Sequence, residues 1–146
     1  MAPELIIFVG LQASGKSTYY HTHFAATHVH VSKDLMANAR DRETKQRQMI
    51  EAALAAGRSV VVDNTNPTPA ARGPLIEIGR RRGARVEAYY FETTVQDAVA
   101  RNRLREGKAR VPDVAIFVTA KKLVAPTFTE GFDEVRVIAP LPGTNA

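Results

Sequence analysis

Apolar and polar positions follow two alternating patterns along the chain. Short runs rich in β-branched and aromatic residues predict five strands, at residues 5–9, 28–32, 59–62, 85–91 and 134–138. The segments between them carry strong helix formers and predict helices at 16–24, 42–56, 70–82, 95–106 and 113–124, with a further helical stretch opening at Asp34. Strands that alternate with helices predict an α/β fold, a mainly parallel sheet with helices on both faces.

The length and composition favour a single globular domain. The chain has 146 residues, which is enough for one compact core and too few for two domains of ordinary size. We expect one domain over residues 1–138 and a flexible C-terminal tail, rich in proline and glycine, over residues 139–146. Cysteine is absent, which excludes disulfides, thiolate zinc sites and cysteine nucleophiles.

The net charge and the first residues bear on partners and location. The formal net charge of +5 favours a polyanionic partner, although many basic proteins bind none. The first residues place an acidic side chain before a short apolar run, unlike a signal peptide or a membrane span. We therefore expect a cytoplasmic protein with no membrane partner.

A glycine-rich segment lies between the first predicted strand and the first predicted helix. Residues 10–17, GLQASGKS, fit the phosphate-binding pattern GxxxxGK[ST] in the strand-to-helix position that its mechanism requires. The backbone N–H groups of this P-loop and the start of the helix would face the phosphates of ATP or GTP. The residues expected to bind the nucleotide are Gly10, Gln12, Ala13, Ser14, Gly15, Lys16, Ser17 and Thr18.

Two side chains of the P-loop have separate predicted roles. Lys16 is expected to reach the β and γ phosphates, and the Ser17 hydroxyl to ligate Mg²⁺. A chance glycine-rich turn is the alternative, but it would need neither the lysine nor the hydroxyl. The sequence therefore predicts a P-loop NTPase or kinase fold.

Two aspartates stand at the ends of the second and third predicted strands. Ligands bind at the carboxyl ends of the strands in an open parallel sheet, so Asp34, Asp63 and the P-loop would share one cleft. Asp34 would accept the proton of an attacking hydroxyl, and Asp63 would bind Mg²⁺ directly or through water. The alternatives are a helix N-cap for Asp34, and for Asp63 an Asx turn with Asn64 and Asn66.

Arginines gather on the predicted helix that precedes a basic, glycine-containing segment at 107–112. Arg101 and Arg105 are four residues apart and share a helix face, whereas Arg103 points elsewhere. Over a closing phosphate site they would neutralise transition-state charge, with the mobile 107–112 segment as a lid. A solvated basic helix is the alternative. No histidine has the spacing or the carboxylates of a usual metal site, and His30 is a candidate neighbour of the acceptor.

Five blocks, together with the P-loop, resemble the kinase domain of the 5′-polynucleotide kinases of phage and animals. They are VHVSKD at 29–34, VDNTNP at 62–67, RNRLR at 101–105, APT at 125–127 and EGF at 130–132. The resemblance extends from Ile6 to Val137. Its most specific parts are the DNTNP block and the late APT and EGF blocks, because many families share the P-loop.

The resemblance implies an ATP-dependent kinase that transfers the γ-phosphate to the 5′-hydroxyl end of DNA or RNA. It implies that the P-loop holds ATP·Mg²⁺ and that Asp34 is the general base. Asp63 would lie in the active cleft, and Arg101 and Arg105 would supply lid or donor-phosphate contacts. Family enzymes are often fused to a phosphatase or ligase domain that completes nucleic-acid repair, and nothing in this sequence resembles one. The resemblance therefore implies a repair enzyme that performs only the 5′ phosphorylation or acts with separate phosphatase or ligase proteins.

The acceptor side departs from the family pattern at two positions. Lys33 stands where family members commonly have arginine, which keeps the charge but loses the bidentate fork. Ala37 stands where the phage enzyme has an arginine for the acceptor phosphate. Acceptor contacts are therefore expected from Lys33, Asp34, Arg40 and Asn64.

Three other functions stay open on the sequence alone. A kinase of a small hydroxyl compound, such as a sugar acid or an antibiotic, would use the same P-loop and carboxylate. A nucleotide-dependent switch would hydrolyse ATP without an acceptor. A catalytically dead remnant would not need the intact Lys16, Asp34 and Asp63.

Overall fold

The computed structural model describes residues 2–36 and 40–139, and the structural statements below concern these residues. Ala37 and most of the predicted tail, residues 140–146, lie outside the described residues. The flexible tail therefore stays a prediction, and so does the domain boundary at residue 138.

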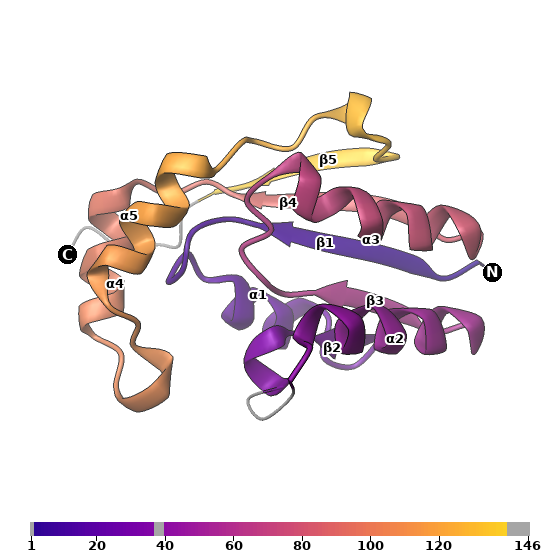
Figure 1. Cartoon of the computed structure of the whole chain (residues 1–146), viewed down its shortest axis with the longest axis horizontal. Helices are drawn as coiled ribbons and strands as arrows, with labels where there is room; N and C mark the ends of the chain where they lie inside the picture. Colours follow the sequence, from indigo (N-terminus) through magenta and orange to yellow (C-terminus); the bar gives the residue numbers. More distant parts are fainter. Residues whose placement is uncertain (1, 37–39, 140–146) are drawn as a thin grey trace.

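Five parallel strands form one sheet through the centre of the molecule (Figure 1). The strands are β1 (Glu4–Val9), β2 (His28–Val31), β3 (Ser59–Val62), β4 (Arg85–Phe91) and β5 (Glu134–Ile138). Their order across the sheet is β2-β3-β1-β4-β5, with each neighbouring pair parallel. The predicted parallel α/β fold is confirmed, and each predicted strand is present to within one residue of its expected ends.

Helices connect the strands and cover the sheet. They are α1 (Lys16–His23), α2 (Arg42–Ala55), α3 (Pro69–Arg81), α4 (Val95–Arg103) and α5 (Asp113–Lys122). Short 3-10 turns occupy Lys33–Met36, Gly107–Ala109 and Phe128–Glu130. Within the described ranges, none of the helices has both the length and the apolar character that crossing a membrane requires.

Among the described residues, the helical stretch expected from Asp34 onward is a 3-10 turn, Lys33–Met36. The next helix, α2, begins separately because Asp41 caps it. The Asp41 carboxylate accepts the backbone N–H of Thr44 at 3.0 Å. Asp34 is thus left on a short connection between the end of β2 and α2.

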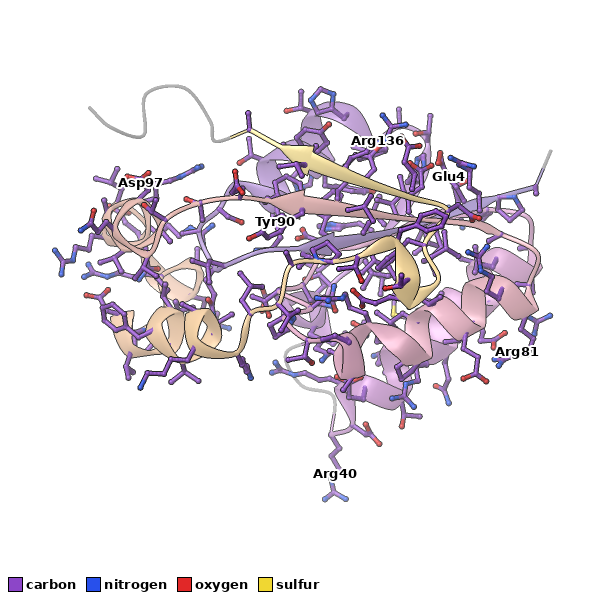
Figure 2. The ribbon with its side chains drawn as sticks, turned by 90° about the horizontal axis from the view of Figure 1, so that it is seen from above. Glu4, Arg40, Arg81, Tyr90, Asp97 and Arg136 are labelled. Carbon is purple, nitrogen blue, oxygen red and sulfur yellow. The ribbon has the colours of Figure 1, made fainter. Side chains whose placement is uncertain are left out.

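Each face of the sheet carries a hydrophobic layer. Leu5 and Ile7 of β1 belong to the cluster formed with α2 and α3. Ile6 and Phe8, which alternate with them, pack on the opposite face with Tyr20 of α1. Figure 2 shows α3 and α1 on opposite sides of the strands. All of β1 after Glu4 is fully buried, which explains its unbroken apolar run.

One buried arginine holds the DNTNP block against the segment that follows α5. Arg72 has no exposed side-chain surface, and it donates from Nε and Nη2 to the two carboxylate oxygens of Glu130 at 2.8 and 3.0 Å. Its Nη1 donates to the carbonyl oxygens of Asn66 at 2.9 Å and Val124 at 3.0 Å. A buried guanidinium requires such a set of acceptors. Arg72 therefore fixes the EGF block next to the end of β3.

Candidate active site

The carboxyl ends of the parallel strands bring the predicted site segments to one edge of the sheet (Figure 1). The P-loop follows β1, residues 32–34 follow β2 and residues 63–67 follow β3. These segments are neighbours because β1 and β2 both pair with β3. Figure 1 shows α4 and α5 at the same edge, where Ala98 and Ile116 pack with Leu11 of the P-loop. Ligands bind at this edge in parallel α/β sheets.

The P-loop has the backbone conformation of an anion cradle. Ala13 and Gly15 have positive φ values of 61° and 94°, and α1 begins directly after them at Lys16. Consecutive N–H groups in such a segment point toward one anion. Gly10 is required by close packing, because a Cβ there would lie 3.0 Å from the carbonyl oxygen of Phe91. The cradle thus fits the phosphates of a nucleoside triphosphate.

Lys16 lies folded into the P-loop, with 8% of its surface exposed. Its Nζ donates to two P-loop carbonyl oxygens, at 3.0 and 2.6 Å. Burial lowers the pKa of Lys16 from 10.5 to about 8. The charge of Asp63 raises this pKa, that of Arg105 lowers it and that of Asp34 raises it. All three charged groups therefore lie close to Lys16, in one site.

Asp63 is buried at the end of β3, and one of its oxygens has two partners. Its Oδ2 accepts from the Ser17 hydroxyl at 2.8 Å and lies 2.8 Å from Nε2 of His30. In the described part of the chain, these two contacts are the hydrogen-bond partners of the Asp63 carboxylate, and it forms no Asx turn. A hydroxyl and a carboxylate side by side are oxygen ligands of the kind Mg²⁺ takes, with phosphates and water completing its shell. Ser17 and Asp63 therefore fit an ATP·Mg²⁺ complex.

His30 is a neighbour of Asp63 whose role sequence analysis did not identify. Its ring stacks on Tyr20 of α1, with ring centroids 3.9 Å apart and planes inclined by 13°. The stacking holds the imidazole against the Asp63 carboxylate, and its place near the acceptor stays a prediction. The contact between His30 and Asp63 follows from the strand register, which pairs His30 with Val61, two residues before Asp63. That register cannot be known before the strand order.

Asp34 stands just past the carboxyl end of β2, on the P-loop side of the molecule. It does not cap a helix, because Asp41 caps α2, so the N-cap alternative is wrong. Its side chain is exposed, and no group in the described residues hydrogen-bonds to its carboxylate. Its charge raises the pKa of Lys16, which places it within range of the phosphate cradle. A carboxylate in this position, with no hydrogen-bond partner among the described residues, is available to accept a proton.

Arg101 and Arg105, here called the arginine pair, lie together although α4 is shorter than predicted. The helix ends at Arg103, before residue 106, and Arg105 follows it. Burial and then the charge of Arg105 lower the pKa of Arg101, so the two guanidinium groups are close. Neither forms a salt bridge with a described residue, whereas Arg103 pairs with Asp113 at 3.2 Å. Two partly buried positive charges close together favour a bound anion. The arrangement therefore fits an anion site better than the alternative of a solvated basic helix.

The segment predicted to be a lid is anchored at Val111, and the helix that follows it, α5, is linked to the P-loop. Asn102 is fully buried; its Nδ2 donates to the Val111 carbonyl oxygen at 2.6 Å and its Oδ1 accepts the Val111 N–H at 3.0 Å. On α5, Thr119 accepts at 2.9 Å from Nε2 of Gln12, which belongs to the P-loop. The side chain of Gln12 thus faces α5, and Thr18 is exposed on α1.

The residues expected to hold the acceptor are brought together only in part. Asp34 reaches the site edge, but the Lys33 ammonium forms an ion pair with Glu43 of α2. Both ends of the Asn64 side-chain amide are bonded within the protein. Figure 2 shows Arg40 extending away from the rest of the molecule. Acceptor contacts by these residues stay predictions.

Gln46 and Arg72 are buried polar residues that sequence analysis missed. Gln46 is 1% exposed and lies on α2 four residues before the buried Ile50. Residues four apart share a helix face, so this spacing placed a polar group on the buried stripe of α2. A polar residue on such a stripe needs an internal partner. The identity of that partner depended on contacts between elements.

Known proteins resemble this chain in sequence and in fold. Residues 5–125 match the family described as AAA domain. The bifunctional polynucleotide phosphatase/kinase of Schizosaccharomyces pombe is 28% identical over 142 residues, which cover 92% of this chain and 33% of that protein. The chain therefore spans about a third of the length of this relative.

Two solved structures have the same fold. A chain of the Pnkp1/Rnl/Hen1 RNA repair complex superposes with a TM-score of 0.69 and 26% identity, over 83% of this chain and 44% of that one. A gluconokinase from Sinorhizobium meliloti 1021 superposes with a TM-score of 0.70 and 18% identity, over 99% of this chain and 86% of that one. The resemblance to polynucleotide kinases and the predicted P-loop kinase fold are confirmed. Because the family match covers most of its length, the protein belongs to the AAA domain family, as a P-loop domain related to polynucleotide phosphatase/kinases.

Proposed function

We propose that the protein is an ATP-dependent kinase that transfers the γ-phosphate to the 5′-hydroxyl end of DNA or RNA, with Asp34 as general base. The observation that carries this proposal is the position of Asp34 on the turn after β2, at the edge of the sheet where the P-loop and the Ser17–Asp63 contact lie. A carboxylate beside a phosphate cradle, with no hydrogen-bond partner among the described residues, is what a hydroxyl acceptor requires. A nucleotide switch without an acceptor would not need it.

The relatives support a polynucleotide as the acceptor. The Schizosaccharomyces pombe relative is named a polynucleotide phosphatase/kinase, and a structural relative belongs to an RNA repair complex. The net charge of +5 favours an anionic acceptor as well. A repair role alongside separate phosphatase or ligase proteins is part of the same proposal.

In the proposed reaction, the Asp34 carboxylate accepts the proton of the acceptor hydroxyl while the hydroxyl oxygen attacks the γ-phosphorus. The new O–P bond forms as the bond from the γ-phosphorus to the β–γ bridging oxygen breaks, and ADP leaves. Lys16 and the arginine pair stabilise charge on the transferred group. Mg²⁺, held by Ser17 and Asp63, would neutralise phosphate charge when bound.

Transfer of label from ATP·Mg²⁺ to 5′-hydroxyl DNA and RNA oligonucleotides tests the proposal. We expect the wild type to label the ends. Asp34→Asn should lower kcat by about 100-fold or more, because general-base catalysis contributes about 10² to 10⁴. Lys16→Ala should abolish transfer. Glu77→Gln is the matched control, because this carboxylate on α3 is 76% exposed and lies outside the site, so full activity is expected.

Each component of the proposal has its own contrary outcome. Undiminished transfer by Asp34→Asn would remove Asp34 as the base but leave the acceptor class standing. A wild type that binds ATP and labels no oligonucleotide would remove the polynucleotide acceptor.

A small hydroxyl compound is the second candidate acceptor. The observation in its favour is that two cationic side chains expected to bind an acceptor phosphate do not point toward the P-loop. Lys33 pairs with Glu43, and Arg40 extends away from the molecule in Figure 2. The same assay with sugar acids in place of oligonucleotides distinguishes the two acceptors, since each predicts label in a different product.

A further inference from the structure

The position of the Asp34 carboxylate depends on the backbone beneath it. No described residue hydrogen-bonds to the carboxylate itself, and the side chain is exposed. The turn that carries it begins with N–H groups that have no partner inside the turn. Two side chains accept from these groups. Asn64 Oδ1 accepts the Lys33 N–H at 2.9 Å, and Ser32 Oγ accepts the Asp34 N–H at 3.3 Å.

Asn64 is itself held by a second amide. Its Nδ2 donates to Oε1 of Gln46 at 2.6 Å, and Gln46 is 1% exposed in the buried face of α2. The orientation of the Asn64 amide follows from these partners, because the Lys33 N–H can only donate and must face the oxygen. The nitrogen is then left to face Gln46. The Asn64 amide therefore has one defined orientation.

This amide relay joins two parts of the site that come from different strands. Asn64 directly follows Asp63, whose carboxylate meets Ser17 at the end of β3. Its bond to Lys33 fastens the turn at the end of β2 to the same point. The relay thus sets the spacing between the Asp34 carboxylate and the place where the phosphates and Mg²⁺ are expected.

We propose that Asn64, backed by Gln46, is a positioning residue that holds the Asp34 turn in register with the P-loop, and not a contact to the acceptor. The inference rests on the proposed role of Asp34 as base. In-line transfer requires near-attack geometry, in which a displacement of about 1 Å costs on the order of 100-fold in rate. Loss of the relay should therefore lower kcat and spare the binding of ATP·Mg²⁺.

The test compares variants that differ in the hydrogen-bonding capacity of one side chain. Asn64→Leu keeps a similar volume but cannot accept from Lys33, and it should lower kcat by about 10- to 100-fold. Asn64→Asp keeps the acceptor oxygen, and Gln46 can turn its amide to donate, so most of the rate should return. Gln46→Met removes only the second bond and should give an intermediate loss. Gln48→Met is the matched control, since Gln48 is exposed on the same helix.

A second readout is independent of catalysis. In the wild type the Lys33 amide is bonded to Asn64, so it should exchange slowly with deuterated solvent. In Asn64→Leu this amide should exchange faster, while amides of β1 keep their protection and the dissociation constant for ATP·Mg²⁺ changes less than about threefold, because the P-loop is untouched. Asn64→Asp should restore the slow exchange.

The outcomes separate this inference from the proposed function. Full kcat in Asn64→Leu, with Asp34→Asn inactive, would overturn the positioning role and leave the base intact. A raised KM for the oligonucleotide with unchanged kcat would also overturn it, because that pattern indicates an acceptor contact. Full transfer by Asp34→Asn would reject the proposed base and, with it, the role given to Asn64.

Discussion

Lys16 carries a charge that its buried position disfavours. It is buried against carbonyl oxygens of its own loop, and burial lowers its pKa from 10.5 to about 8. Because the unfolded chain binds this proton more tightly, Lys16 makes the free energy of unfolding rise with pH between about 8 and 10.5. Phosphates would reverse the effect by favouring the ammonium form.

Nucleotide binding should therefore take up a proton. At pH 8 Lys16 is about half protonated, and phosphates raise its pKa, so we expect uptake of roughly half a proton. Near about pH 6 the lysine is already charged and uptake should vanish. Calorimetric binding enthalpies in two buffers of different ionisation enthalpy measure the uptake. The Lys16→Arg variant stays charged throughout and should show none, and equal enthalpies for the wild type at pH 8 would contradict the expectation.

Single residues of the site could be predicted from sequence where a backbone motif specifies them. The P-loop residues were found because strand, glycines, lysine and hydroxyl occur in one fixed spacing. The partners of Asn64 and His30 could not be found that way. Each contact joins residues from different strands or helices, so it exists only once the sheet order is known.

At the scale of elements, the segment after α5 depends on one buried ion pair. Arg72 of α3 has no exposed side-chain surface, and it binds Glu130 through two hydrogen bonds. The pKa of Glu130 is raised by burial, but the hydrogen bonds from Arg72 and Thr127 outweigh this and hold it below its usual value. The carboxylate is thus ionised at neutral pH and compensates the guanidinium.

Removing this carboxylate should destabilise the fold strongly. Glu130→Ala leaves Arg72 buried and uncompensated, and we expect the free energy of unfolding to fall by about 3 to 5 kcal/mol. Glu77→Ala breaks an exposed pair with Arg81, at 3.6 Å, and should cost less than about 1 kcal/mol. Urea denaturation of both variants measures the difference. If both variants lose a similar free energy of unfolding, the buried ion pair contributes no more to stability than the exposed one.

The helices and strands followed from the sequence where burial is simple. The apolar run of β1 is covered on both faces, so its pattern alone marks a buried strand. The helical stretch expected from Asp34 and the end of α4 differed most from the prediction, because local turn chemistry decides such boundaries. Asp41, and not Asp34, caps α2, and the chain leaves α4 at Arg103 ahead of Gly107, which has a positive φ. Several residues near each boundary could have served, and the sequence pattern alone does not choose among them.

At the scale of the whole molecule, the net charge of +5 acts over longer distances than any single contact. For a polynucleotide acceptor, KM should rise with ionic strength. With about three phosphates contacted, the rise between about 50 and 200 mM salt should be about 20- to 40-fold, because bound counterions are released on association. Steady-state kinetics at several salt concentrations measure it. A KM that does not change with salt concentration would indicate an uncharged or small acceptor.

The direction of the sheet decides what can be attached to this domain without blocking it. All five strands run the same way, so Glu4 enters at the edge opposite α4 and α5, and Ile138 leaves at their edge (Figure 1). The two edges are about 20 Å apart, the length of a six-residue strand. A purification tag or a fused domain placed before Glu4 would lie at the edge of the sheet opposite the P-loop. A polypeptide attached after Ile138 would begin at the same edge of the sheet as the P-loop, where a bulky attachment would crowd the proposed phosphate site.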